Sequence, residues 1–144
     1  MNYISQKRYE HRIRGYFMKD FEVKILDDTD YRFIDALKNL GMSRNVATTL
    51  TYLSNVKEAS SQEIEMSTGL RQPEVSVAMR QMREKHWISV HNKKAIGKGR
   101  PTKIYTLNAP IEEIIKHYEE KIIEDTKTTM IAIKKLKTIS KGME

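Results

Sequence analysis

The pattern over residues 60–107 restricts the fold of this chain more than any other feature. Ser60 is followed three positions later by Glu63, which is the spacing of a capping box at the start of a helix. This helix is expected to end at about Thr68, because Gly69 suits a left-handed turn position. The segment therefore predicts one short helix followed by a tight turn.

A second helix is predicted after the turn. Proline is tolerated at the first position of a helix, and Pro73 stands where this helix would begin. Apolar residues then recur at helical spacing up to about His86, and they predict the buried face: Val75, Ala78, Met79 and Met82. Two helices joined by a turn that contains glycine form a helix-turn-helix unit.

A β-hairpin with a basic loop is predicted next. Apolar residues predict one strand at Trp87, Ile88 and Val90 and a returning strand at Ile104, Tyr105 and Leu107, with residues 91–103 as the loop. Between Lys93 and Lys103, five of the eleven residues are basic and none is acidic. Glycines in the loop allow the backbone to approach a wall of phosphates closely, which makes a polyanion the expected partner.

The positive charge of the chain is concentrated in two segments. The formal net charge is +7, and residues 61–107 carry nine basic and four acidic side chains. Residues 1–26 carry six basic and three acidic side chains, whereas residues 108–144 carry seven of each. A polyanion is therefore expected to bind the middle segment and the N-terminal arm.

The outer face of the second helix carries side chains suited to reading double-stranded DNA. The residues expected to contact DNA from the turn and this helix are Arg71, Gln72, Glu74, Ser76, Val77, Arg80 and Arg83. Gln72 can pair with adenine, Glu74 can accept a hydrogen bond from cytosine, and Val77 can touch a thymine methyl group. Ser76 can bond a base or a phosphate, and the arginines can reach phosphates beside the groove. The alternative is an amphipathic helix with a solvated face.

The basic loop is expected to add contacts to the minor groove or the DNA backbone. Its candidate residues are Lys93, Lys94, Lys98, Arg100 and Lys103. Arg100 could enter a minor groove, where narrow walls concentrate negative potential. The alternative is a solvated hairpin tip, or a lysine-rich edge that discourages aggregation.

Two further helices and a strand are predicted before residue 60. Phe21, Val23 and Ile25 alternate with polar residues, which indicates a short strand or an extended arm. Asp27, Asp28 and Asp30 offer oxygens to cap a helix that Gly41 can end, with a buried face at Phe33, Ile34, Leu37 and Leu40. A cation site is the alternative for these aspartates. The next helix begins at Ser43 and would bury Val46, Leu50 and Leu53.

Residues 41–107 resemble the DNA-binding domain of winged helix-turn-helix regulators, in particular the TrmB-like and MarR-like groups. The resemblance is carried by residues 60–64 (SSQEI), residues 68–76 (TGLRQPEVS) and, most strongly, residues 99–107 (GRPTKIYTL). It implies a mainly α fold with a small antiparallel β-hairpin wing, and it makes the helix from Pro73 the recognition helix and Arg100 the wing-tip residue. The chain lacks the large sensor domain of many TrmB-like proteins, so a small-molecule effector stays open.

We divide the chain into an N-terminal arm (1–26), a winged helix-turn-helix DNA-binding domain (27–109) and a C-terminal dimerisation helix (110–144), and the arm has no counterpart in the family that the chain resembles. Pro110 would open a helix of roughly thirty residues with an apolar seam that Asp125 interrupts: Ile111, Ile115, Tyr118, Ile122, Thr129, Leu136 and Ile139. Members of the family commonly dimerise through such helices, so we expect a homodimer that binds two DNA half-sites. The alternative is that the helix folds back on its own domain.

Several other classes of protein are disfavoured. The chain has no cysteine, its four histidines lack metal-ligand spacing, and no nucleophile and base pair is evident, so we expect neither an enzyme nor a metal or other cofactor. No apolar run suits a signal sequence or a membrane span, which makes the cytoplasm the expected location. The remaining alternative is a winged-helix module that docks proteins of the transcription or RNA machinery, although docking needs no basic wing.

Overall fold

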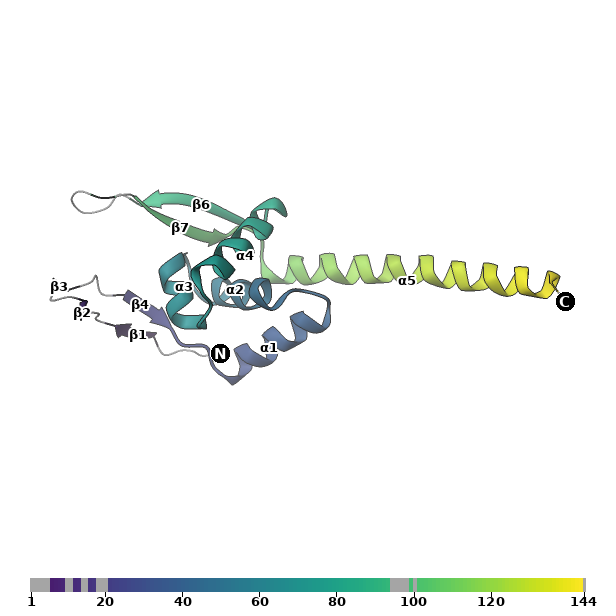
Figure 1. Cartoon of the computed structure of the whole chain (residues 1–144), viewed down its shortest axis with the longest axis horizontal. Coiled ribbons are helices and arrows are strands. Elements are labelled where there is room, and N and C mark those ends of the chain that lie inside the picture. The colour runs from purple at the N-terminus through teal and green to yellow at the C-terminus, as the bar shows by residue number, and fades with distance from the viewer. Residues whose placement is uncertain are drawn as a thin grey trace. The chain divides into compact units, whose positions relative to one another are not determined.

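The computed structural model describes the backbone of residues 6–9, 12–13, 16–17, 21–93, 99 and 101–143, and the side chains among these from residue 24 onward. The described elements are β1 (Gln6–Tyr9), β2 (Arg12–Ile13), β3 (Tyr16–Phe17), β4 (Phe21–Lys24), α1 (Asp28–Asn39), α2 (Arg44–Asn55), β5 (Ala59–Ser60), α3 (Ser61–Thr68), α4 (Gln72–Glu84), β6 (Ile88–Lys93), β7 (Thr102–Leu107) and α5 (Ile111–Gly142) (Figure 1). The chain divides into two compact units, residues 1–109 and residues 110–144. The predicted fold class, mainly α with a small antiparallel sheet and a long C-terminal helix, is confirmed.

The core of the first unit is built around α2. Every residue from Val46 to Leu53 is buried, although apolar spacing predicted only one buried side for this helix. The reason is that α1, α3, α4 and β7 all contact α2, so that no face is left to water. The threonines of this run are small, and the Thr51 hydroxyl donates to the Ala47 carbonyl of the same helix at 2.8 Å.

The end of α1 departs from the predicted buried face. Leu40 is exposed, and Met42 is buried in its place. Gly41 adopts a φ of +97°, and the Gly41 and Met42 N–H groups donate to the carbonyls of Lys38 and Leu37. This left-handed helix end reverses the chain and brings Met42 back to the core, which spacing along a straight helix does not reveal.

One sheet of the first unit has three antiparallel strands in the order β5-β7-β6. The two long strands confirm the predicted hairpin, but they extend to Lys93 and begin again at Thr102, so the loop is shorter than predicted. The third strand, β5, was not predicted, because two residues are too short to show alternation. Its pairing of Ala59 with Tyr105 and Ser60 with Ile104 joins the hairpin to the start of α3.

The N-terminal arm contains antiparallel strand pairs. β1 pairs with β4 from Gln6 opposite Lys24 to Tyr9 opposite Phe21, and β2 pairs with β3. Only the β4 strand was predicted, and Ile25 lies beyond its end. β4 is attached to the helices where it ends, because the Lys24 N–H donates to the Tyr52 hydroxyl at 3.4 Å and the Ser67 hydroxyl donates to the Lys24 carbonyl.

Asp27, just before α1, and Asp30, in its first turn, cap the helix, as the sequence indicated. The Asp27 carboxylate accepts from the Asp30 N–H at 2.9 Å, and the Asp30 carboxylate accepts from the Asp27 N–H at 3.0 Å. These hydrogen bonds favour the charged form of Asp27 and lower its pKa below the usual value, with the Asp30 backbone as the main cause.

The capping box predicts a pH dependence of stability. A carboxyl whose pKa is lowered by folding stabilises the folded chain above its unfolded pKa, and this contribution is lost as the pH falls through the folded pKa. We expect Asp27→Asn, which keeps a capping side chain but cannot titrate, to flatten the loss of stability below about pH 4. Urea denaturation at several pH values measures the free energy of unfolding of the variant and of the wild-type protein. Equal slopes of this free energy against pH for the two proteins would contradict the prediction.

Candidate nucleic-acid interface

The turn between α3 and α4 is held by local hydrogen bonds. Gly69 has a φ of +74°, and its N–H donates to the Glu65 carbonyl at 2.9 Å. The Thr68 hydroxyl accepts from the Leu70 N–H at 3.2 Å, while the Leu70 side chain is buried. The predicted left-handed position at Gly69 is confirmed, and the buried Leu70 anchors the turn from which α4 departs.

The inner face of α4 matches the sequence prediction. Its buried residues are Val75, Ala78, Met79 and Met82. Pro73 is the second helical residue and not the first, since α4 begins at Gln72. The proline still fits, because backbone N–H groups in the first turn of a helix have no partner within the helix.

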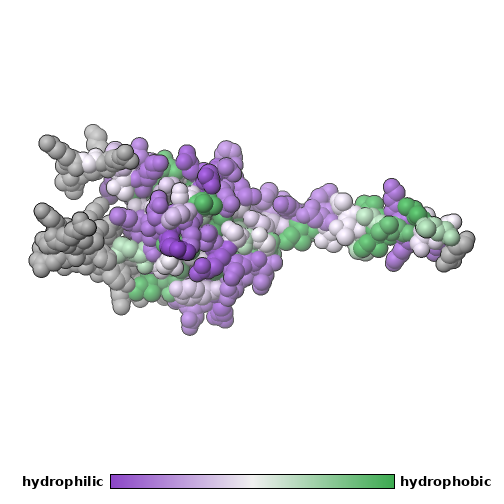
Figure 2. All heavy atoms as spheres, viewed as in Figure 1, coloured by the Kyte–Doolittle hydropathy of each residue, from purple (hydrophilic) through white to green (hydrophobic). Residues whose placement is uncertain are grey.

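The outer face of α4 is open to solvent. Gln72, Ser76, Arg80 and Arg83 are exposed and share one side of the helix, because they are spaced by three or four residues. Val77 is 39% exposed beside them, and Arg71 is exposed just before the helix. Figure 2 shows that hydrophilic residues dominate the visible face of this unit.

Glu74 has a role that its sequence position did not suggest. The side chain is half-buried, and its carboxylate accepts from the Arg71 N–H at 3.2 Å. The same carboxylate lies 3.5 Å from Nε of Arg71. Glu74 therefore caps α4 and positions Arg71, which competes with the predicted hydrogen bond to cytosine.

The hairpin is attached to the end of α4 by a compact turn. His86 has a φ of +61°, and the Trp87 N–H donates to the Met82 carbonyl at 3.0 Å. The Trp87 side chain is buried, and the Lys85 ammonium lies 5.2 Å from the centre of its ring. These contacts fix the direction in which β6 leaves α4.

The described lysines of the hairpin lie on opposite faces. Lys93 pairs with Thr102, and Lys103 pairs with Asn92, one position earlier on β6. Because successive side chains of a strand point to opposite faces, the exposed Lys93 and Lys103 project from the two sides of the ribbon. Lys94, Lys98 and Arg100 lie outside the described residues.

The start of α3 adds a candidate that the sequence reading did not include. Gln62 is exposed in the first turn of α3, next to the Ser60–Glu63 capping box. In helix-turn-helix proteins the first helix crosses the DNA backbone, and helix N-termini bind phosphates. The capping box marked this helix start, and the same signal could have suggested Gln62.

Other kinds of site are not evident in the described part of the chain. There, no three histidine or acidic residues gather closely enough to hold a metal ion. Among the described helices, none has an apolar stretch long enough to cross a bilayer. A shallow depression on α5 is lined by Met130, Ile131, Ile133, Lys134 and Lys137, all of them surface side chains of one helix.

The element order and the geometry of the first unit can be compared with known proteins. No protein-family model and no curated protein matches the chain. Among solved structures, the chain is similar to the archaeal chromatin protein TrmBL2, with a TM-score of 0.52 and 16% identity over 75% of this chain. The fold is a winged helix-turn-helix. At this identity the likeness shows the fold alone, and the chain spans 40% of the length of TrmBL2.

Two other solved structures resemble this winged helix-turn-helix protein more weakly. A possible transcriptional regulator from Methanosarcina mazei has a TM-score of 0.46 and 12% identity, covering 85% of this chain and 98% of that one. A MarR family regulator from Neisseria meningitidis has a TM-score of 0.43 and 16% identity, covering 79% of this chain and 84% of that one.

Proposed function

We propose that this protein is a transcription regulator that binds double-stranded DNA sequence-specifically, without catalysis or a cofactor. The observation that carries the proposal is the open outer face of α4, held next to a basic hairpin. An inner face of four apolar residues anchors α4, while Gln72, Ser76, Arg80 and Arg83 remain free to contact a groove. TrmBL2, which has a similar fold, is described as a DNA-binding chromatin protein.

In this proposal α4 enters the major groove. A groove about 12 Å wide admits one helix, and its polar side then lies against the base edges. Gln72 and Ser76, in the first turns of α4, are assigned to bases, and Val77 to a thymine methyl group. Arg80 and Arg83 are assigned to phosphates, and Glu74 to positioning Arg71 rather than to a base.

The hairpin β6–β7 with its loop, which we call the wing, is assigned to the minor groove and its walls. Lys93 and Lys103 project from opposite faces of this ribbon, so a wing set into a groove directs one lysine towards each strand of the duplex. Lys94, Lys98 and Arg100 of the loop are proposed to supply the remaining contacts.

The same proposal assigns residues 1–26 to an arm, residues 27–109 to DNA binding and residues 110–144 to dimerisation, in a cytoplasmic homodimer. The exposed apolar residues along α5 support dimerisation, since they include Ile131 and Leu136 at 69% and 65% exposure. A two-fold dimer binds two half-sites separated by one helical turn of DNA or a multiple of it.

Selection of bound duplexes from a random pool tests this function. The expected result is a recovered motif with two related half-sites. Gln72→Ala should relax the preference at one base pair of each half-site by about 1–3 kcal/mol, because a bidentate base contact is lost. Glu84→Ala, at an exposed position near the end of α4, is the matched control and should recover the wild-type motif.

Two results would contradict the proposal. If no motif is recovered and the affinity for DNA does not depend on the salt concentration, the result favours a protein-docking module. An unchanged motif for Gln72→Ala would show that α4 does not read the bases.

A further inference from the structure

The C-terminal half of α5 carries positive charge that the described part of the chain does not neutralise. Residues 126–143 contain five lysines and no acidic residue, whereas residues 112–125 contain six acidic and two basic side chains. In the acidic half, the Lys116 ammonium lies 4.0 Å from the Glu120 carboxylate. Among the described residues, no lysine after residue 126 forms such an ion pair, and all five are exposed. These lysines are therefore accessible to an anionic partner.

Four of the five lysines share one face of the helix. At about 3.6 residues per turn, their positions fall within about a quarter of the helix circumference. We call this face the lysine ridge, and its residues are Lys127, Lys134, Lys137 and Lys141. The seam proposed for dimerisation passes through Leu136 and Ile139 on the opposite side of the helix. A second copy paired along the seam therefore leaves the ridge open.

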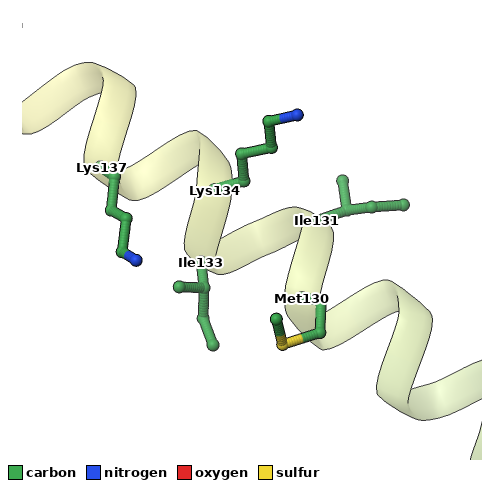
Figure 3. A pocket seen from close by; sticks show the side chains of 5 residues that line it. All are labelled: Met130, Ile131, Ile133, Lys134 and Lys137. Atoms are coloured by element: carbon green, nitrogen blue, oxygen red, sulfur yellow. The ribbon is translucent and has the colours of Figure 1, made fainter.

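The lysines of the ridge lie close enough to repel one another. Lys134 and Lys137 are three residues apart, and Lys141 follows four residues later. Like charges at these spacings destabilise a helix. The first two border one shallow depression (Figure 3), whose other lining residues are Met130, Ile131 and Ile133. A row of negative charges along the ridge would turn this repulsion into attraction.

Two simpler explanations of the ridge do not suffice. The helix macrodipole favours basic side chains only in the last turn, so it accounts for Lys141 but not for Lys127, Lys134 and Lys137. Solubility requires charge on an exposed helix but does not require one sign, and acidic side chains serve it at least as well. A face of lysines without acidic residues is instead typical of a surface that binds a polyanion.

We propose that the lysine ridge is a second nucleic-acid site, which binds the phosphates of double-stranded DNA without reading the sequence. At about 1.5 Å per residue the ridge is about 21 Å long, and one DNA strand presents about six phosphates over this length. The inference goes beyond the proposed function, because it adds a DNA-binding surface outside the winged helix-turn-helix unit and leaves base reading to α4.

The geometry of α5 favours DNA over a lipid surface as the polyanion. A helix that lies on an anionic bilayer buries its apolar face in the lipid. Here Leu136 and Ile139 face away from the ridge, so lipid contact along the apolar face would direct most of the lysines towards water. A rigid row of phosphates needs only the ridge itself.

Binding to random-sequence duplex DNA tests the inference, because contacts to particular bases contribute little there. The full chain is compared with a ridge variant that combines Lys127→Gln, Lys134→Gln, Lys137→Gln and Lys141→Gln. Fluorescence anisotropy at several salt concentrations measures the affinity. The slope of log affinity against log salt should become less negative by about three to four, and the affinity at about 0.1 M salt should fall at least tenfold.

A control variant with the same change in charge isolates the ridge. It carries substitutions to glutamine at four exposed basic residues of the first unit: Arg32, Lys38, Arg44 and Lys57. Its salt slope should stay within about one of the wild-type value. An unchanged slope in the ridge variant would show that the ridge is only a solvated face. Equal changes in the two variants would show an effect of net charge, and either result overturns the inference.

Two further measurements separate the ridge from the rest of the protein. The ridge variant should keep the wild-type mass in light scattering, because the seam is unchanged, and should recover the wild-type motif in duplex selection, because the ridge reads no bases. Loss of the mass or of the motif would mean that the lysines act through the dimer contact or through the operator site, which overturns the inference.

Vesicles of phosphatidylcholine with about one third phosphatidylserine test a membrane as the partner. If the wild-type protein binds these vesicles more tightly than random-sequence DNA, and the ridge variant does not bind them, the ridge belongs to a lipid surface and the inference fails. The proposed function is decided separately. If the wild-type protein recovers no motif but its affinity for random-sequence DNA depends on the ridge, sequence-specific binding fails and this inference is supported.

Discussion

Asp30→Ala is expected to lower the free energy of unfolding by about 3–5 kcal/mol, because it removes an ion pair to a buried ammonium together with a helix cap. The Lys24 side chain is 3% exposed, and its ammonium lies 3.5 Å from the Asp30 carboxylate. Burial lowers the pKa of Lys24, and the charge of Asp30 opposes this lowering. The carboxylate also accepts from the Asp27 N–H and from the Asn55 amide at 2.9 Å, so the change removes a helix cap as well.

Urea denaturation followed by circular dichroism measures this loss. Asp28→Ala is the matched control, because Asp28 is exposed in the same first turn of α1 and should cost below about 1 kcal/mol. The double variant Lys24→Met/Asp30→Ala should recover part of the stability, since the buried Lys24 charge is then removed as well. Equal losses for Asp28→Ala and Asp30→Ala would show that the ion pair contributes nothing.

Replacing Lys93, Lys98, Arg100 and Lys103 together with glutamine is expected to weaken DNA binding strongly. If each side chain neutralises one phosphate, the slope of log affinity against log salt should become less negative by about four. This change in slope corresponds to a loss of DNA affinity on the order of 10²-fold at 0.2 M salt. Fluorescence anisotropy of a labelled duplex at several salt concentrations measures both quantities.

A second variant with the same change in charge isolates the wing. Its substitutions to glutamine are at exposed basic residues of α1, of α2 and of the turn that follows α2: Arg32, Lys38, Arg44 and Lys57. These positions lie outside the proposed interface, so the salt slope should stay within about one of the wild-type value. Equal changes in both variants would mean that net charge, and not the wing, determines the affinity.

Local signals in the sequence predicted the elements of the candidate interface. The Ser60–Glu63 capping box, the left-handed Gly69 and the apolar spacing of α4 each depend on residues only a few positions apart. The structure contains all three where they were expected. The alternating strands of the hairpin were recognised for the same reason, although the first was predicted to end too early and the second to begin too late.

Features that depend on distant residues were missed or wrongly assigned. The β5 strand exists because β7, more than forty residues later, pairs with it. Met42 replaces Leu40 in the core because the chain reverses at Gly41. Burial of Lys24 follows from the packing of β4 against helices that come later in the chain.

The sequence by itself determined the helices, β4 and the two strands of the hairpin, where α3 begins, and which side chains of α4 are buried. Only the tertiary structure decided that α2 is buried on all sides, that Glu74 caps α4 and positions Arg71, and that Lys93 and Lys103 face opposite ways. The physical reason is the separation along the sequence of the residues that determine each feature. Caps, turns and periodicity act over a few residues, whereas burial and strand register depend on which surfaces meet once the chain has folded.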